Sequence, residues 1–170
     1  PEADNTAGDQ SNIWEVGAEV GGKAGGASYN ISATYQKADL EVAAAGSEDF
    51  KVWSIGGDVS MSGFKIGAGY SKDNQGTSAA NTDNTNWNIG ATYSTGPWTV
   101  GAAYGNTEDE AGTGAGSDER KTWHLGGSYT FGPGISFSAG IENTKLEDNA
   151  NAAANENDAT SIIVGTALFF

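Results

Sequence analysis

Apolar and polar side chains alternate along most of the chain, and glycine-rich or acidic stretches interrupt the alternation at intervals. Alternation with a period of two is typical of a β-strand whose two faces meet different surroundings. Segments that begin with tryptophan, any residue, an apolar residue and two small residues recur roughly every 35 residues, at Trp14, Trp53, Trp87 and Trp123. We therefore expect nine strands, over residues 12–20, 27–36, 50–60, 64–72, 86–94, 98–107, 121–131, 135–145 and 159–170.

The connections between these strands alternate between short and long. The short ones, 21–26, 61–63, 95–97 and 132–134, are rich in glycine and other turn-forming residues. The long ones, 37–49, 73–85, 108–120 and 146–158, are polar and acidic. Several strands have about 9–11 residues, the length that crosses a bilayer at a tilt. Short turns at one end and long loops at the other predict an all-β, antiparallel transmembrane β-barrel formed by one domain, 1–170.

One face of the predicted strands carries no charged residue and holds all tryptophans and tyrosines of the chain. The rings lie mostly at the ends of the apolar stripe, whereas a soluble sandwich core, the alternative fold, would place them centrally. Because amphipathic rings prefer the headgroup level of a bilayer, we expect two aromatic girdles on a lipid-facing surface. The predicted girdle residues are Trp14, Trp53, Trp87, Trp98, Trp123, Tyr35, Tyr70, Tyr93, Tyr104 and Tyr129.

The opposite face is small and polar, with many of the 26 glycines of the chain. A polar interior is the reverse of a soluble lipocalin-type barrel and implies water inside and lipid outside. Side chains this small cannot fill an eight-stranded barrel, so a wider barrel is expected. The ionisable residues predicted to line the pore are Glu15, Glu19, Asp58, Lys65, His124 and Glu142. Their acidic excess predicts weak cation preference, the alternative being that they are merely solvated wall residues.

The net charge of −14, with only 8 lysines and arginines, argues against nucleic acid as a partner. It suits a cell-surface protein or a pore that attracts cations. The mean hydropathy is −0.43, and no run of 18 apolar residues occurs, so no transmembrane helix is expected.

Catalytic and metal-binding chemistry finds little support. A single histidine, no cysteine and no clustered base exclude most nucleophilic triads, so no enzyme is expected. His124 on a wet wall is better explained as solvated than as a metal ligand. The acidic loops at 73–84 and 106–119 have oxygen groups that bind Ca²⁺, but neither has EF-hand spacing. Solvated, mobile loops without a cofactor are the favoured interpretation.

Three segments resemble the Gram-negative porin family, and its alphaproteobacterial branch in particular. They are Trp-Asn-Ile-Gly-Ala-Thr-Tyr at 87–93, Val-Gly-Ala-Ala-Tyr at 100–104 and the alternating tail 162–170. The similarity extends over essentially the whole chain as a spaced pattern. It implies an outer-membrane channel for passive diffusion of small hydrophilic solutes, built as a homotrimer of 16-stranded barrels. It also implies that the terminal Phe170 is a signal for the barrel-assembly machinery.

The number of strands predicted here, nine, is smaller than the 16 strands of a barrel in this family. With an odd number, the first and last strands run in the same direction, so an all-antiparallel barrel cannot close. We expect the chain to be the C-terminal part of a porin, with residues 1–11 as the end of an extracellular loop and the missing N-terminal strands supplied by another piece. The alternatives are a non-conducting structural or adhesive barrel, and an outer-membrane enzyme, for which no acid–base constellation is evident.

Overall fold

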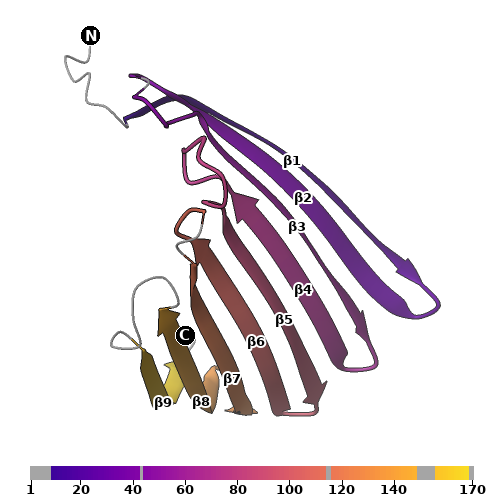
Figure 1. Ribbon diagram of the computed structural model, residues 1–170. Coiled ribbons are helices and arrows are strands. Elements are labelled where there is room, and N and C mark those ends of the chain that lie inside the picture. Colours follow the sequence, from indigo (N-terminus) through magenta and orange to yellow (C-terminus); the bar gives the residue numbers. More distant parts are fainter. Residues whose placement is uncertain (1–8, 43, 114–115, 149–155, 169–170) are drawn as a thin grey trace.

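The computed structural model describes residues 9–42, 44–113, 116–148 and 156–168, and they form a single curved sheet (Figure 1). Nine strands follow one another in sequence order, and every neighbouring pair is antiparallel. The strands are β1 (Gln10–Ala24), β2 (Ala27–Leu40), β3 (Phe50–Met61), β4 (Phe64–Asp73), β5 (Asn84–Thr95), β6 (Trp98–Glu110), β7 (Ser117–Gly132), β8 (Ile135–Asp148) and β9 (Asn157–Leu168). The predicted all-β, antiparallel architecture is confirmed.

Most strands extend past their predicted limits, chiefly at the end with the long loops. β2 continues to Leu40 and β8 to Asp148, although the apolar alternation ends earlier. The ladder of backbone hydrogen bonds does not need apolar side chains, so pairing persists where the alternation no longer marks it. At the N-terminal end, Gln10 and Ser11 belong to β1, where Gln10 pairs with Leu40, and residues 1–8 of the predicted loop lie outside the described residues.

A tight turn joins β3 to β4 through Ser62 and Gly63, whose φ angles are 51° and 86°. Two successive positive φ angles match the twist of a two-residue hairpin. A Cβ atom on Gly63 would lie 2.3 Å from the carbonyl oxygen of Ser94, and the Ser94 N–H donates to the Gly63 oxygen at 2.8 Å. Glycine is therefore required here both by the turn and by the neighbouring end of β5.

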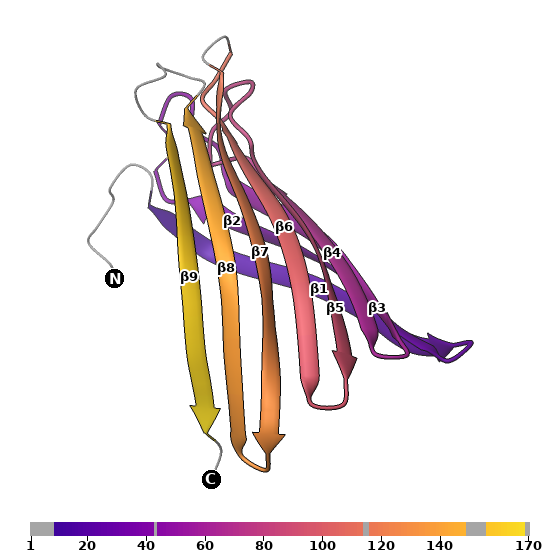
Figure 2. The same cartoon turned by 90° about the horizontal axis from the view of Figure 1, so that it is seen from below.

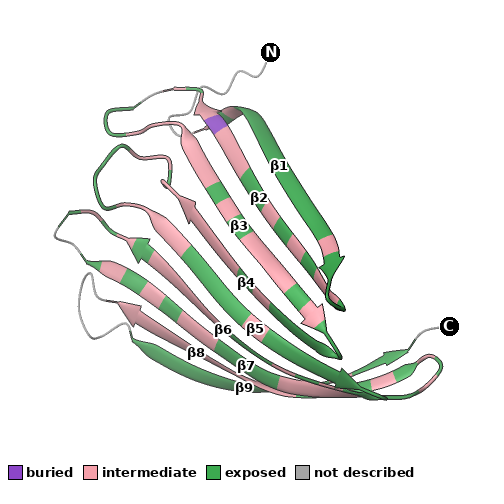
Figure 3. Cartoon of the chain, turned by 90° about the vertical axis from the view of Figure 1, so that its right-hand side faces the viewer, coloured by how far each residue is buried: buried purple, intermediate pink, exposed green. Residues whose placement is uncertain are grey.

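The sheet is one layer thick and has no enclosed core (Figure 3). Among the described residues only Ala38 is a buried hydrophobic residue, while Ile162 is 80% exposed. The accessible surface is 10961 Å², whereas a compact soluble protein of 17.3 kDa exposes about 7800 Å². The alternative of a soluble sandwich is thus excluded for this sheet.

The sheet is open. β1 and β9 lie at its two ends in the strand order, and no strand pairing joins them within the described part of the chain (Figure 2). Since successive strands alternate in direction, β1 and β9 run the same way. The nine strands therefore form a barrel wall with two edges rather than a closed barrel. No helix in the described residues is long and apolar enough to span a membrane.

Candidate pore wall

All six predicted pore-lining residues point to the same face of the sheet. A hollow of 570 Å³ on this face is bordered by Asn30 on β2 and His124 on β7, with Asp58 and Lys65 between them. Because β2 and β7 are five positions apart in the sheet, one hollow can contact both only on the concave face, which the curvature in Figure 3 makes visible. Its floor is lined by inward glycines, namely Gly56, Gly67, Gly69, Gly90 and Gly101.

Four of these residues form two pairs across neighbouring strands. Lys65 Nζ lies 3.2 Å from Asp58 Oδ1, and both side chains remain partly exposed. His124 is directly opposite Glu142, with Nδ1 2.9 Å from Oε2. Halfway along the wall, Lys65 therefore offsets the charge of Asp58, and His124 contacts Glu142.

The other two predicted residues, Glu15 and Glu19, lie on β1 at one edge of the sheet. Lys23 shares their face at the turn end of this strand. Neither glutamate forms an ion pair with another residue that the structure describes. These two carboxylates are thus not brought together with the Asp58 and Glu142 pairs.

A row of acidic residues that the sequence did not predict as a group crosses the concave face at the loop end. We name it the aspartate row: its four carboxylates, Asp73, Asp109, Asp118 and Asp148, lie in one line of the strand register from β4 to β8, and the neutral Asn84 lies between Asp73 and Asp109. Burial and the nearby Asp109 and Asp83 raise the pKa of Asp73, against the hydrogen bond that it accepts from the Gln75 N–H. Asp109 accepts a hydrogen bond from Gln75 Nε2. Only the strand register reveals this row, because its members are far apart in sequence.

The convex face carries the predicted girdle residues in two rows. The loop-side row comprises Trp14, Tyr35, Trp53, Tyr70, Trp87, Tyr104 and Trp123, and three pairs within it have ring centroids 5.2 to 5.4 Å apart. The turn-side row contains Tyr93, Trp98 and Tyr129, joined by Phe64 and Phe131, with centroids 4.3 to 4.7 Å apart. On β8 and β9 the loop-side row continues with Ile141 and Ile162, which are directly paired.

The loop-side row runs obliquely to the hydrogen bonds of the sheet. Trp53 is directly opposite Lys72, but its ring contacts Tyr70, two residues nearer the turns. On the other side, Trp53 is directly opposite Tyr35. The row thus shifts by about one residue per strand, which corresponds to a strand tilt of about 35° for a rise of about 3.3 Å and a spacing of about 4.8 Å. The strands of transmembrane barrels have this tilt, and at this tilt such a row would run parallel to the plane of a bilayer.

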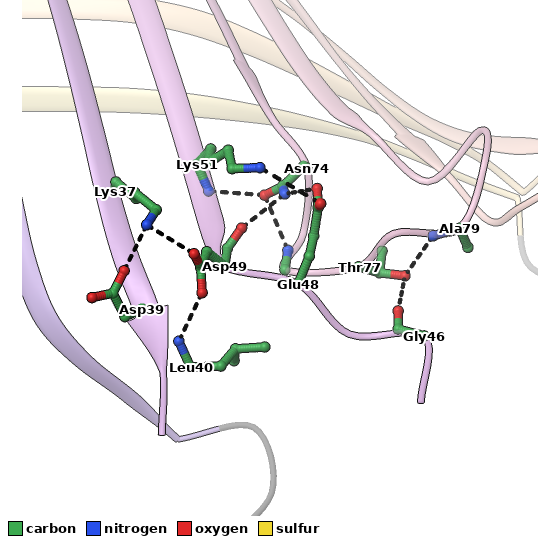
Figure 4. A network of polar contacts seen from close by, with 11 residues as sticks. Lys37, Asp39, Leu40, Gly46, Glu48, Asp49, Lys51, Asn74, Thr77 and Ala79 are labelled. Atoms are coloured by element: carbon green, nitrogen blue, oxygen red, sulfur yellow. Dashed lines mark hydrogen bonds and ion pairs between the residues drawn. The ribbon is translucent and has the colours of Figure 1, made fainter. Parts of the chain in front are cut away.

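The long loops are joined to one another rather than independent. Asn74 accepts a hydrogen bond from the Lys51 N–H at 2.9 Å and donates from Nδ2 to Glu48 Oε1 at 2.6 Å (Figure 4). Asn74 Nδ2 also donates to the Asp49 carbonyl oxygen at 3.0 Å. Thr77 Oγ1 donates to the Gly46 oxygen at 2.9 Å. The segment 73–84 is therefore tied to the loop between β2 and β3, in contrast to the mobile loop that its composition predicted.

Two predictions concern residues or ligands that these contacts do not test. Phe170 lies outside the described residues. Within the described residues, no group of three or more His, Cys, Asp or Glu side chains is arranged to hold a metal ion. Calcium binding by the acidic loops, the less favoured alternative, is not tested by these contacts.

Comparison with known protein families gives a match. The family model described as Gram-negative porin matches residues 1–149. No curated protein matches the chain.

Proposed function

Since this chain belongs to the Gram-negative porin family and hence to the outer membrane, we propose that it forms part of the wall of a water-filled channel for passive diffusion of small hydrophilic solutes and ions. One observation carries the proposal: a concave face with a polar, glycine-lined hollow lies behind a convex face with large exposed apolar side chains. Such a wall has water on one side and lipid on the other. The family is one of channels rather than enzymes, and we propose no catalytic role.

The arrangement of the wall favours conduction over the non-conducting alternative. A structural barrel without a pore has an interior filled with bulky, mutually paired side chains. Here the concave face is mostly glycine, serine, threonine and asparagine, and among its described residues Asp58 pairs with Lys65 and Glu142 with His124. We therefore place solute passage along this face.

A weak preference for cations follows from the distribution of charge. Lys65 offsets the charge of Asp58 in the middle of the wall, and the aspartate row adds carboxylates at the loop end, where Arg120 shares its face. Carboxylates that line a narrow aqueous entrance raise the local concentration of cations. The preference therefore depends on the entrance more than on the middle of the wall.

We also propose that the barrel is completed by further strands. The free edges of β1 and β9 would leave backbone groups unpaired in lipid, which is unfavourable by several kcal/mol for each group. Because β1 and β9 run in the same direction, an odd number of additional strands keeps both seams antiparallel, and seven would give the 16 strands of the family. The proposals of a homotrimer and of membership in the alphaproteobacterial branch rest on family resemblance alone.

Single-channel recording tests the proposal. The chain is refolded in detergent and added to a planar bilayer, alone and after co-refolding with a strand segment that supplies the missing part of a porin barrel. Stepwise, ohmic conductance under either condition supports a channel wall. A closed, membrane-inserted barrel that contains this chain and passes no current would contradict it.

A further inference from the structure

The single histidine of the chain, His124, faces a carboxylate on the neighbouring strand of the concave face. The strand register places it directly opposite Glu142, and His124 Nδ1 lies 2.9 Å from Glu142 Oε2. The two side chains are 50% and 32% exposed, so both meet the solvent of the proposed pore. An imidazole at this position can therefore exchange its proton with that solvent.

The neighbours of this pair are small and uncharged. On its other side His124 lies directly opposite Ala103 of β6, and Glu142 lies directly opposite Ser161 of β9. A hollow of 380 Å³ is lined by the pair, and among the described residues that line it only His124 and Glu142 are ionisable. The charge that an ion meets in this hollow is therefore the charge of the pair.

The other ionisable residues that the structure describes on the concave face of β6, β7 and β8 lie nearer the long loops. They are Asp109 on β6, Asp118 and Arg120 on β7, and Asp148 on β8. Each is four or six residues along its strand from the level of the pair, which corresponds to about 13 to 20 Å. Screening in physiological salt acts over about 8 Å, so these groups have little effect at that level.

The pair of Asp58 and Lys65 offers an internal comparison. Both residues border the 570 Å³ hollow, as His124 does. Lysine side chains keep their charge across the physiological range, whereas an imidazole in water changes its charge between about pH 5 and 8. The pair of Asp58 and Lys65 therefore has no net charge throughout this range. The pair of His124 and Glu142 has one negative charge while the imidazole is neutral, and none once it is protonated.

We propose that His124 and Glu142 form a proton-sensitive selectivity site of the channel. While the imidazole is neutral, the Glu142 carboxylate favours cations in the adjacent hollow. As the pH falls, the protonated His124 cancels this charge and the cation preference decreases. No strand or loop has to move, because the two side chains are already in contact. This inference rests on the proposed function, the passage of ions along the concave face.

Reversal potentials in a potassium chloride gradient, measured at about pH 8 and about pH 5, test the proposal. The chain is co-refolded with the same strand segment as for single-channel recording. In the parent the cation-to-anion permeability ratio should be about fivefold lower at the acidic pH, the factor expected for one unit charge at about 8 Å in water.

Substitutions in the pair identify the groups responsible. His124→Gln should keep the alkaline ratio of the parent at both pH values, and His124→Lys should show the acidic ratio of the parent at both. Glu142→Gln at the alkaline pH should match the parent at the acidic pH, because the pair then has the same net charge.

Two further variants are matched controls on the same face. Burial raises the pKa of Asp73 toward the range tested, so Asp73→Asn shows whether this group contributes to the step. Asp73→Asn should lower the ratio at both pH values and leave the fivefold step in place. Lys65→Gln should raise the ratio at both pH values and also keep the step.

Two results would overturn the inference while leaving the channel proposal standing. One is a parent ratio that is the same at both pH values. The other is a step of equal size in the parent and in His124→Gln, which would assign the titration to a different group. Absence of current at either pH from an inserted, closed barrel would instead refute the channel proposal and this inference with it, so the two failures are distinguishable.

Discussion

Asp109 on β6 lies directly opposite Asp118 on β7, and Asp118 in turn lies opposite Asp148 on β8. Like charges in directly opposed positions are unfavourable for a sheet. All three residues share the concave face with His124 and Glu142, further along the same strands. The strand register thus concentrates negative charge at one end of the proposed pore.

Removing charge from the aspartate row should weaken cation preference. A unit charge at 8 Å in water stabilises a cation and destabilises an anion by roughly 0.5 kcal/mol each, so Asp109→Asn should lower the cation-to-anion permeability ratio about fivefold, and Asp73→Asn with it should lower the ratio further. Reversal potentials in a potassium chloride gradient measure the ratio. Lys65→Gln changes the net charge in the opposite sense and should raise it. An unchanged reversal potential in the Asp73 and Asp109 variants would place the selectivity elsewhere.

Gly63→Ala should destabilise the sheet far more than the same substitution in another hairpin. At Gly63 the new Cβ would meet the Ser94 oxygen at 2.3 Å, in addition to a φ of 86°. Together these effects should lower the free energy of unfolding by about 1–3 kcal/mol. Gly25→Ala is the control, because φ is 56° and nothing lies within 4 Å of its Cβ position. Urea titration in detergent should order the variants as parent, Gly25→Ala, Gly63→Ala, and equal midpoints for the two substitutions would contradict the steric argument.

Asn74→Ala should loosen the loops without changing the strands. The substitution removes the acceptor of the Lys51 N–H and the donor to Glu48. Loss of a partner for a partly buried N–H should reduce local stability by about 1 kcal/mol, which accelerates exchange of the Lys51 amide roughly fivefold. Hydrogen exchange read by NMR or mass spectrometry measures this. Asn86→Ala is the control, since its side chain donates to Thr107 Oγ1 at 2.9 Å within the sheet and does not join the loops; comparable acceleration in both variants would argue against a special role for Asn74.

Much of the fold could be predicted because it depends on local alternation. The parity of Trp53 and Ile55 against Ser54 and Gly56 assigns two faces without knowledge of neighbours, and turn residues such as Gly63 locate the hairpins. The extent of β2 to Leu40 could not be predicted, because there the ladder continues beneath polar side chains that no longer alternate.

Features that depend on register were missed for a different reason. Asp73 and Asp109 are 36 residues apart and meet on one row only through the pairing of β4 with β5 and β5 with β6. Similarly, the contact between Asn74 and Glu48 joins two loops whose compositions separately predict mobility. The partner strands of β1 and β9 have no signature in the chain itself, so the completed barrel stays a proposal.

Glu147 should keep its charge to unusually low pH. Hydrogen bonds from Lys121 and Lys145 lower its pKa from an ordinary value of 4.5 to about 2. Because the pKa is depressed in the folded state, the contribution of these contacts is fully present above pH 4.5 and is lost as the pH falls through about 2. Titration of the Glu147 carboxyl carbon by NMR should therefore show a charged group at pH 3. In Lys121→Gln the carboxylate loses its first partner and remains directly opposite Glu119, so its midpoint should rise toward 4.5. Lys65→Gln, on the other face, should leave the midpoint in place, and an equal shift in both variants would show that net charge, rather than the contact with Lys121, sets the titration.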